Sequence, residues 1–266
     1  MKPFLKWAGG KYKIIDKVKS KLPQGDRLVE PFVGSGAVFM NTEYDRYLLA
    51  DSNADLINTF VYLQTQGLSF IDYCKQFFTP ENNIESVFYE LRQEFNDTQD
   101  KRKKSALFIY LNRHCFNGLC RYNGSGKFNV PFGRYASPMF PEKEMIAFFE
   151  KSHKAEFKIA TFEDTFKQVQ KNDVVYCDPP YVPLSPSSSF TAYTKNGFTL
   201  NEQLSLAAHA NAQMARGICV VISNHDTVFT REAYAAASIE AFDVQRYISS
   251  KASDRKPAGE LLALFA

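Results

Sequence analysis

The apolar residues of the chain follow different spacings in three successive zones. In the first zone, to about residue 55, short apolar runs alternate with turns that contain glycine, and Arg27–Leu28–Val29–Glu30 and Tyr47–Leu48–Leu49–Ala50 predict strands. Between them, Pro31–Phe32–Val33–Gly34–Ser35–Gly36 predicts a turn, with a short helix from Ala37 onwards. Strand, glycine turn, helix and strand in this order are typical of the start of a parallel α/β sheet.

The second zone, about residues 56–144, is dominated by helical spacing. Four segments carry it: Leu56–Gln64, Phe70–Phe78, Ile84–Phe95 and Ser105–Leu111. After them, Asn123–Gly124–Ser125–Gly126 separates two extended stretches within Phe116–Tyr135. Because Asn and Gly tolerate the positive φ of tight turns, we expect a β-hairpin at about 116–135.

The third zone, from about residue 145, returns to α/β alternation. Its expected strands are Phe157–Ala160, Val174–Cys177, Ile218–Ser223, Ala241–Ile248 and Leu261–Phe265. A loop rich in proline and serine, Pro183–Ser189, interrupts this zone. The pattern predicts an α/β catalytic domain in two pieces, residues 1–55 and 145–266, with a mostly helical insertion at 56–144.

Composition places the chain among globular proteins. Of its 266 residues 45% are hydrophobic, and the formal net charge is only +3, so it lacks the features of a disordered chain. The net charge alone does not indicate a nucleic-acid partner. Five cysteines without a C-x-x-C pair indicate neither a disulfide scaffold nor a metal site, and no metal is expected. Without a signal peptide or a long apolar segment, we expect a cytoplasmic protein that does not enter membranes.

The glycine turn is the first candidate binding site. Glycines between a strand and a helix allow a ligand to approach the backbone closely, as in nucleotide-binding turns. The turn lacks the third glycine of G-x-G-x-x-G, since Ala37–Val38–Phe39 follows Gly36. Asp51 ends the next strand and could hold the hydroxyls of a ribose. An ordinary tight turn with an exposed aspartate explains the same residues equally well.

The tetrapeptide Asp178–Pro179–Pro180–Tyr181 carries the most chemical information. It follows the apolar run Val174–Cys177, and ligands of open α/β sheets bind beyond the carboxyl ends of strands. The two prolines remove backbone donors, so nearby carbonyls remain as acceptors. A carboxylate and a carbonyl together could accept both hydrogens of an exocyclic amino group, while Tyr181 offers a ring for stacking. An ordinary Pro-Pro loop is the alternative.

That arrangement suits the activation of an aromatic amine. The amino nitrogen of adenine or cytosine is a poor nucleophile because its lone pair is delocalised into the ring. Drawing its hydrogens toward tetrahedral geometry localises the lone pair, which can then attack a methyl sulfonium in line, with positioning and charge stabilisation as the main contributions. In duplex DNA such a base must be flipped out of the stack, at a cost of a few kcal/mol.

The motifs together resemble a known family. Lys6–Trp7–Ala8–Gly9–Gly10–Lys11, the glycine turn and the Asp-Pro-Pro-Tyr loop occur here in the order found in S-adenosylmethionine-dependent DNA adenine-N6 methyltransferases of the α-group, specifically the Dam type that methylates GATC. The similarity runs from about Phe4 to Phe265 and includes Asn117–Asn123 and Phe128–Tyr135. It implies a Rossmann-like methyltransferase sheet, with an inserted recognition domain that carries the hairpin, and a monomer that acts on double-stranded DNA.

The resemblance implies roles for individual residues around the cofactor and the target base. S-adenosylmethionine would lie against Trp7, Lys11, Phe32, Gly34, Gly36, Asp51, Phe162 and Asp178. Asp51 would hold its ribose, and Phe162 would lie near its adenine. The loop residues Asp178, Pro179, Pro180 and Tyr181 would be catalytic and position the target adenine.

The resemblance also implies a set of DNA contacts. Lys6 and Arg121 would each read a guanine of GATC, Phe116 would insert into the duplex, and Asn117 would engage the orphaned thymine or a phosphate. Relatives often have Tyr where this chain has Phe116, so a hydroxyl contact is lost while the stacking surface is kept. The remaining expected DNA-binding residues are Arg113, Leu119, Asn123, Pro131, Arg134 and Tyr135.

Charge is distributed unevenly in a way that supports a DNA-binding insertion. Residues 101–141 contain no Asp or Glu. Eight basic residues lie there: Lys101, Arg102, Lys103, Lys104, Arg113, Arg121, Lys127 and Arg134. Basic side chains attract phosphates, while sequence is read at base edges, where an Arg–guanine pair is worth about 1–3 kcal/mol of discrimination. For Lys101–Lys104 a solvated start of a helix is at least as good an explanation.

Three functions therefore compete at the level of sequence. The first is N6-adenine methylation of GATC in DNA; the second is the same chemistry on RNA or on a protein glutamine, against which Asp178 argues because many such relatives have Asn there. The third is a catalytically silent DNA-binding protein. The neighbours Ser223–Asn224–His225–Asp226 suggest a hydrolase, but no G-x-S-x-G motif accompanies them and we reject that reading.

Overall fold

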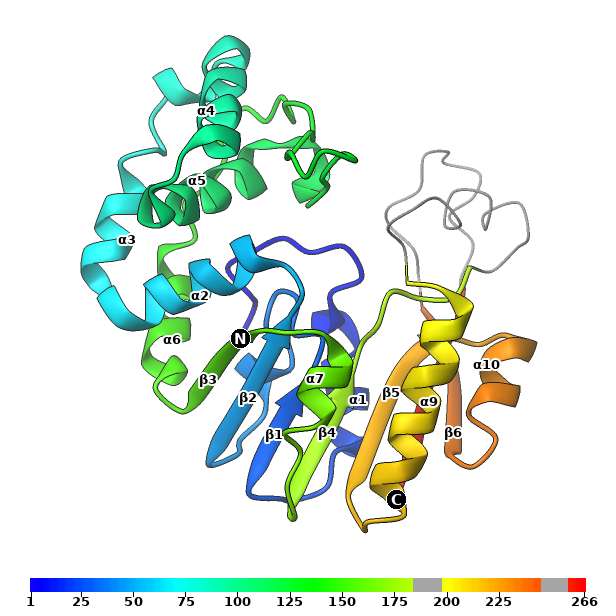
Figure 1. Cartoon of the computed structure of the whole chain (residues 1–266). Coiled ribbons are helices and arrows are strands. Elements are labelled where there is room, and N and C mark those ends of the chain that lie inside the picture. Colours follow the sequence, from blue (N-terminus) through cyan, green and yellow to red (C-terminus); the bar gives the residue numbers. More distant parts are fainter. Residues whose placement is uncertain (184–197, 245–257) are drawn as a thin grey trace. The chain divides into compact units, whose positions relative to one another are not determined.

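The computed structural model describes residues 1–183, 198–244 and 258–266. The chain folds as two compact units (Figure 1). Unit 1 comprises Met1–Ile15, Val33–Glu43 and Asp51–Ile159, and unit 2 comprises Asp16–Phe32, Tyr44–Ala50 and Ala160–Ala266. These units divide the chain at other residues than the expected functional domains, whose boundaries stay predictions.

The strands form one mixed sheet. Their bounds are β1 Arg27–Glu30, β2 Arg46–Asp51, β3 Ala155–Ile159, β4 Asp173–Cys177, β5 Cys219–His225, β6 Ser238–Val244 and β7 Ala258–Phe265. The order across the sheet is β3-β2-β1-β4-β5-β7-β6. Strand β1 is parallel to both β2 and β4, and β4 is parallel to β5, whereas β7 runs antiparallel between β5 and β6. This is a mixed α/β sheet with four parallel strands in the order β2-β1-β4-β5, so the α/β class that the sequence predicts is confirmed.

Burial explains why the central strands are so apolar. All five residues of β4 are buried, because helices cover both faces of a parallel strand in such a sheet. On one face, the helices α7 (Phe162–Phe166), α9 (Leu200–Met214) and α10 (Val228–Ala233) pack on the strands of unit 2. Helix α9 begins with a capping box in which Thr199 and Glu202 satisfy each other's backbone N–H groups.

Helix α1 (Ile15–Lys21) covers the opposite face of the sheet in unit 2. Along β6, Ile239 packs into the core on the α9 side. Since side chains alternate along a strand, Glu240 and Phe242 must face the other side. There Lys21 pairs with Glu240 at 2.6 Å, and Lys17 lies 5.0 Å above the Phe242 ring.

Unit 1 is mostly helical. Its helices are α2 Ala54–Gln66, α3 Leu68–Lys75, α4 Glu85–Asp97, α5 Lys101–His114 and α6 Glu142–Ser152, with short 3₁₀ turns at Lys11–Ile14, Phe39–Asn41, Glu81–Asn83 and Phe116–Gly118. Each of the four helical segments expected at 56–111 is confirmed by α2 to α5. Asn53 caps α2 and Asp100 caps α5 by accepting backbone N–H groups of their first turns.

Aromatic residues form much of the interior of unit 1. Phe60, for example, lies 4.8 Å from Phe148 and 5.9 Å from Phe4, measured between ring centroids. A second group joins Phe95 to Phe128 at 5.7 Å. Most of the aromatic residues near the expected insertion are therefore core rather than exposed stacking surface.

Two local expectations differ from the structure. No α-helix begins at Ala37; the backbone instead forms a single 3₁₀ turn at Phe39–Asn41, because the two glycine turns at Gly34 and Gly36 are followed by only a short run before β2. The expected hairpin at 116–135 contains no regular strand. Two isolated antiparallel bridges, Cys115 to Phe132 and Tyr122 to Phe128, hold its two sides together. The loop Pro183–Ser189 and the end of the strand expected at Ala241–Ile248 fall mostly outside the described residues.

Candidate active site and DNA-binding residues

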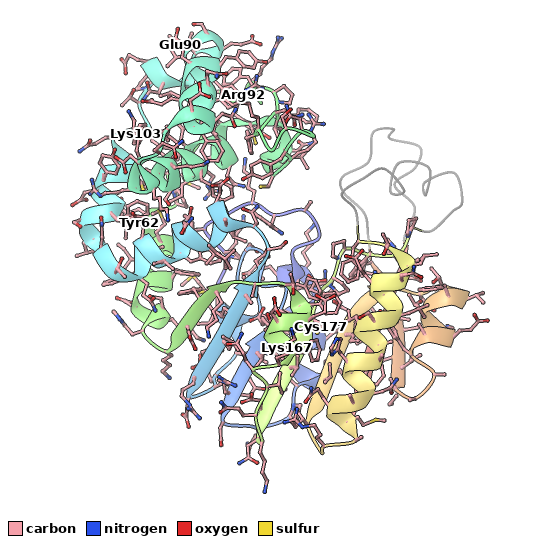
Figure 2. All side chains as sticks on the ribbon, in the orientation of Figure 1. Tyr62, Glu90, Arg92, Lys103, Lys167 and Cys177 are labelled. Carbon is pink, nitrogen blue, oxygen red and sulfur yellow. The ribbon has the colours of Figure 1, made fainter. Side chains whose placement is uncertain are left out.

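The Asp-Pro-Pro-Tyr loop leaves the sheet at the position where α/β proteins bind ligands. It follows β4, whose last residue, Cys177, is marked in Figure 2. Strand β1 has β2 on one side and β4 on the other, so the order of the strands reverses there. Ligands of open α/β sheets bind at such a switch point, beyond the carboxyl ends of the strands. Phe32 follows β1 at this same edge.

A hydroxyl group holds the carboxylate of Asp178. Ser223 Oγ on β5 lies 2.9 Å from Asp178 Oδ1 and donates to it. Tyr176 Oη on β4 donates in turn to Ser223 Oγ at 3.1 Å. Tyr176 is completely buried, and burial raises its pKa well above the usual value, with the charge of Asp178 acting in the same direction. Tyr176 therefore stays protonated and can act as a donor.

Buried amides fix the backbone of the loop. Gln203 on α9 donates through Nε2 to the Pro180 carbonyl at 2.7 Å. Asn224 on β5 accepts the backbone N–H of Val182 at 3.0 Å, and its own Nδ2 donates to Gln203 Oε1 at 3.0 Å. Both amide side chains are at most 1% exposed. Buried polar groups of this kind persist only when they are satisfied, so they specify one loop conformation.

Tyr181 is held at both ends of its side chain. Its hydroxyl donates to Glu260 Oε2 on β7 at 3.2 Å. Its ring meets the edge of the His225 ring, with centroids 4.8 Å apart. His225 Nδ1 lies 2.6 Å from the Val182 carbonyl and must carry a hydrogen to bond with it. The stacking surface expected of Tyr181 is thus fixed in orientation.

Phe32 and Phe162 lie together in unit 2. Their rings stack with centroids 5.7 Å apart, and both also contact Phe198. Phe162 is buried at 5% exposure in the main core of the sheet, while Phe32 lies at the border of that core. The structure therefore brings these two expected cofactor residues together.

The glycine turn in unit 1 has the geometry of a binding turn. Gly34 and Gly36 have φ angles of +48° and +73°, where residues with a side chain are strained. A Cβ at Gly34 would lie 2.9 Å from Trp7 Nε1, so the Trp7 ring rests directly on the turn. Lys11 is buried beside this segment, and its Nζ donates to the Gly9 carbonyl at 2.6 Å.

Asp51 closes the glycine turn from the end of β2. Its carboxylate accepts the backbone N–H of Gly34 at 3.1 Å and that of Asn53 at 2.9 Å. Burial raises the pKa of Asp51, and the backbone hydrogen bonds oppose that shift. Asp51 is therefore bonded into the turn. The alternative explanation from the sequence, a tight turn with an exposed aspartate, does not describe it.

Several expected DNA-binding residues gather around the start of the chain in unit 1. The amide of Asn112 on α5 bonds both backbone groups of Lys6, at 2.8 Å each. Lys6 Nζ lies 4.3 Å above the Tyr135 ring, and the Tyr135 hydroxyl accepts the backbone N–H of Asn117 at 2.9 Å. Burial and then the charge of Arg113 lower the pKa of Lys6. The sequence does not predict that Asn112 holds the backbone of Lys6. Its position about one helical turn before the Phe116–Asn117 segment is the only feature that could have indicated it.

The segment after α5 presents an aromatic ring to solvent. Phe116 is 50% exposed, and its backbone N–H bonds the Pro131 carbonyl at 2.8 Å. Asn117 adopts a left-handed backbone with φ of +55°. Leu119 is partly buried, and its carbonyl accepts Cys115 Sγ at 3.4 Å. The loop after α5 thus holds an exposed aromatic ring on a backbone that is tightly bonded.

The remaining polar residues of this region have different surroundings. Arg121 is exposed and donates from Nε to Asn129 Oδ1 at 2.7 Å and from Nη2 to the Asn129 carbonyl at 3.2 Å. The side chain of Asn123 accepts the backbone N–H groups of Ser125 and Lys127, which is a turn-forming role. Arg113 is partly buried, and its Nε has no hydrogen-bond partner among the residues that the structure describes.

Half of the basic residues at 101–141 pair with carboxylates of unit 1. These ion pairs are Lys103 with Glu94, Lys104 with Asp55, Lys127 with Asp97 and Arg134 with Glu85. Arg102 instead stacks on Tyr73, 4.0 Å from the ring centroid. Figure 2 marks Lys103 among the side chains of this unit. Three residues of the first turn of α5, Arg102, Lys103 and Lys104, are therefore engaged within the protein, and the choice between a solvated start of a helix and a phosphate clamp stays a prediction.

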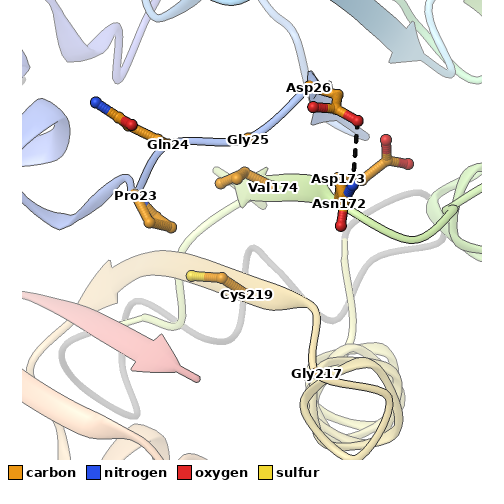
Figure 3. A pocket seen from close by; sticks show the side chains of 9 residues that line it. All are labelled: Pro23, Gln24, Gly25, Asp26, Asn172, Asp173, Val174, Gly217 and Cys219. Carbon is orange, nitrogen blue, oxygen red and sulfur yellow. Dashed lines mark hydrogen bonds between the residues drawn. The ribbon is translucent and has the colours of Figure 1, made fainter.

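A pocket also opens in unit 2 at the amino ends of the strands, opposite to the Asp-Pro-Pro-Tyr loop. It has a volume of about 510 Å³ and lies where β1, β4 and β5 begin (Figure 3). Its polar lining includes Asp26, which accepts Asn172 Nδ2 at 3.3 Å, and Cys219, whose pKa burial raises to about 11. Ligands of open α/β sheets bind at the carboxyl ends of the strands, whereas this pocket lies at the amino ends. The Cys219 thiol is protonated at neutral pH and is therefore a weak nucleophile.

The described residues contain neither a membrane-spanning helix nor a cluster of metal ligands. No helix in 1–183, 198–244 or 258–266 is long and apolar enough to cross a membrane. In the same ranges, no group of three or more His, Cys, Asp or Glu side chains has the arrangement of a metal site.

Comparison with known proteins identifies the family. Residues 7–248 match the model of the D12 class N6 adenine-specific DNA methyltransferases. DNA adenine methylase of Escherichia coli (strain K12) is 49% identical over 262 residues, covering 98% of this chain and 94% of that protein. The chain belongs to the D12 class of N6-adenine-specific DNA methyltransferases. It is an adenine-specific DNA methyltransferase, which removes the RNA, protein-glutamine and catalytically silent alternatives.

Other relatives agree with this assignment. The DNA adenine methylase of Vibrio cholerae (strain ATCC 39541) is 49% identical over 98% of this chain, and that of Serratia marcescens is 48% identical over 98%. These matches cover 95% and 97% of the two relatives. The crystal structure of a precorrin 8w decarboxylase from Methanobacterium thermoautotrophicum aligns over 96% of the chain at 9% identity, but a TM-score of 0.38 is too low to indicate a shared fold.

The contacts of the D12 methyltransferase loop include residues that sequence reasoning did not assign to it. In the sequence, Ser223 and Asn224 suggest only a hydrolase-like cluster, and no motif marks Gln203. Asp226 bonds Arg231 at 2.6 and 2.8 Å, and His225 Nδ1 bonds the Val182 carbonyl at 2.6 Å. A signal was present in the sequence: polar residues at the end of β5 sit next to the loop after β4, because parallel neighbours end at the same edge.

Proposed function

We propose that this methyltransferase transfers the methyl group of S-adenosylmethionine to N6 of an adenine that is flipped out of double-stranded DNA, within the sequence GATC. The single observation that carries the proposal is the Asp178 loop: an oriented carboxylate followed by two prolines, beyond β4 at the switch point of the sheet. A recognition domain at about residues 56–144 would select the site, and the enzyme would act as a monomer.

The chain's residues fit the cofactor at the glycine turn. Gly34 and Gly36 allow the positive φ that the turn requires, and Asp51, which ends β2 beside the turn, offers a carboxylate for ribose hydroxyls. Trp7 lies against the turn as an apolar wall. Lys11, Phe32 and Phe162 would complete the binding residues. When bound, S-adenosylmethionine supplies an electrophilic methyl group.

The loop would activate the target amine. The Pro180 carbonyl already accepts Gln203, so we assign the second acceptor to the Pro179 carbonyl. Asp178 and this carbonyl would each accept one hydrogen of the adenine amino group, which concentrates the lone pair on N6. Tyr181 would stack on the base that has left the duplex. Positioning and charge stabilisation then account for the acceleration, and no covalent enzyme intermediate forms.

The recognition residues would divide into two kinds of contact. Arg121 and Lys6 would read the two guanines, and Phe116 would fill the space left by the flipped adenine with Asn117 on its orphaned partner. Arg121 donates to Asn129 from the Nε side of its guanidinium, so the terminal edge would be the part that meets O6 and N7 of guanine. Arg113, Arg134, Asn123 and Tyr135 would contact the backbone, and Leu119 and Pro131 would contact bases through apolar atoms.

The proposal is tested in two steps. The protein is expressed in a methylation-free host, and plasmid from that host is digested with GATC endonucleases that are blocked by N6-methylation or require it. Digestion unchanged from the untransformed host contradicts the GATC assignment. Arg121→Ala is then compared with the parent enzyme on GATC and on duplexes with one guanine replaced. We expect the preference to fall about 5- to 150-fold, which corresponds to about 1–3 kcal/mol. An equal loss on every duplex would instead make Arg121 a phosphate contact.

A further inference from the structure

Behind the Asp178 carboxylate lies a short chain of hydroxyl groups. Tyr176 Oη donates to Ser223 Oγ at 3.1 Å, and Ser223 Oγ lies 2.9 Å from Asp178 Oδ1. Ser223 Oγ is also 3.3 Å from the Cys177 carbonyl. A serine has a single hydrogen to donate, and the shorter bond to an ionised carboxylate is the stronger of the two. The serine therefore accepts from Tyr176 and donates to the aspartate, and the Tyr181 hydroxyl is a further hydrogen-bond neighbour of the same serine.

This chain is buried and rigid. Ser223 and Tyr176 are each 1% exposed, and they lie on the neighbouring central strands β5 and β4. Water does not compete with bonds at this depth, and each bond polarises the next. On the other side of the loop, Gln203 and Asn224 hold the backbone at Pro180 and Val182. The backbone at Pro180 and Val182 is thus held by residues other than Ser223, whereas Ser223 bonds the Asp178 carboxylate itself.

We propose that Ser223 is a positioning residue for methyl transfer, and that Tyr176 acts only through it. The hydroxyl of Ser223 holds the Asp178 carboxylate in the plane in which it accepts a hydrogen of the adenine amino group. This inference rests on the proposed role of Asp178. Neither Ser223 nor Tyr176 touches the base; they set the direction of the acceptor that does.

The orientation matters because the acceptor must follow a nitrogen that is changing its geometry. As the lone pair localises on N6, its hydrogens leave the plane of the base, and a carboxylate that has lost the bond from Ser223 would be aligned with them for less of the time. A misplacement of 1 Å costs about a hundredfold in an enzyme reaction. Binding of the base in its ground state does not depend on this alignment, so the loss should fall on the chemical step.

The main experiment compares Ser223→Ala, Ser223→Thr and the control Ser152→Ala in the full chain. Ser152 is also completely buried, and its hydroxyl bonds the Phe149 carbonyl at 2.7 Å on α6. Single-turnover methylation of a GATC duplex is measured beside the Kd of S-adenosylmethionine and of DNA. For Ser223→Ala we expect the rate of methyl transfer to fall at least about tenfold, as for loss of a hydrogen bond to a charged group. Both Kd values should stay within about twofold of the parent values. Ser223→Thr, which keeps the hydroxyl, should regain most of the rate.

A purely structural serine gives a different result. It would lower the melting temperature and weaken binding along with the rate, and Ser223→Thr would be as slow as Ser223→Ala. Either outcome overturns the inference. Tyr176→Phe supplies a second measurement, since it removes only a hydroxyl: we expect a smaller loss of rate in the parent enzyme and no further loss in the Ser223→Ala background. Additive losses would contradict the claim that Tyr176 acts through Ser223.

Asp178→Asn separates this inference from the function on which it rests. If Asp178→Asn methylates at the parent rate, the role of Asp178 itself is wrong. If Asp178→Asn is inactive while Ser223→Ala keeps full activity, the proposed function stands and the positioning role of Ser223 is refuted.

Discussion

Gly34 offers the sharpest test of the cofactor site, because replacing it by alanine moves one identified side chain. The backbone there has φ of +48°, and a Cβ would lie 2.9 Å from Nε1 and 3.1 Å from Cδ1 of Trp7. Gly217, after α9 in unit 2, has φ of +71° with no atom within 4 Å of a Cβ. Gly217→Ala is therefore a matched control that shares the strain of the backbone without the collision.

The two costs can be estimated separately. A left-handed conformation costs an L-residue about 1–2 kcal/mol, and both variants should lose about that much stability. An ordinary contact begins at 3.4 Å, so the Trp7 ring must move by about 0.5 Å (3.4 − 2.9) in Gly34→Ala alone. Displacements of this size in a positioned site cost about tenfold. We expect the Kd for S-adenosylmethionine to rise about tenfold in Gly34→Ala and to stay unchanged in Gly217→Ala.

The chain supplies its own reporter for this measurement. Trp7 is its single tryptophan, so a change of intrinsic fluorescence on titration with S-adenosylmethionine comes from the wall of the site itself. Thermal unfolding of both variants gives the strain common to them. If the two variants bind S-adenosylmethionine equally well, Trp7 does not form that wall, and the assignment of the glycine turn to the cofactor fails.

Two further predictions concern charge. Glu85→Gln removes the ion-pair partner of Arg134, whose side chain is 77% exposed. Since surface ion pairs are worth up to about 1 kcal/mol, DNA binding at low salt should tighten by up to about fivefold. The control Glu90→Gln removes the same charge elsewhere on α4 (Figure 2) and should tighten DNA binding less. Equal effects would mean that only net charge matters. Burial lowers the pKa of His114 from 6.5 to about 4, so the unfolded chain takes up the proton first, and stability present above pH 6.5 is lost progressively as the pH falls toward 4. Between pH 7 and pH 5 the parent should lose about 2 kcal/mol of unfolding free energy more than His114→Phe, measured by urea denaturation, and parallel losses would refute this.

The regular elements could be predicted because burial imposes a period on the sequence. The run Val174–Cys177 is apolar throughout since β4 is covered on both faces, and Arg27–Glu30 was predicted with the bounds that β1 has. The prediction of a short α-helix from Ala37 onwards is wrong, because the local pattern contains too few residues to distinguish a 3₁₀ turn from an α-helix.

The site itself was only partly accessible from the sequence. Asp178 was found because prolines mark its loop, and Asp51 because it ends a strand at a familiar distance from the glycine turn. Ser223 contacts Asp178, which lies 45 residues earlier in the chain, and Gln203 contacts Pro180, which lies 23 residues earlier. No local pattern encodes such a pairing, since it depends on which strands and helices become neighbours.

The ion pairs between α4 and the basic stretch change what salt dependence of DNA binding would report. Each phosphate that an arginine or lysine neutralises releases condensed cations from DNA, and the number of such contacts is usually read from the slope of affinity against salt. Here Glu85 and Asp97 already serve Arg134 and Lys127 as counterions. When a phosphate displaces such a carboxylate, the carboxylate recruits a cation from solution and part of the released salt is taken up again. The slope should therefore count fewer phosphates than the protein touches, so a shallow salt dependence would not indicate a small DNA interface.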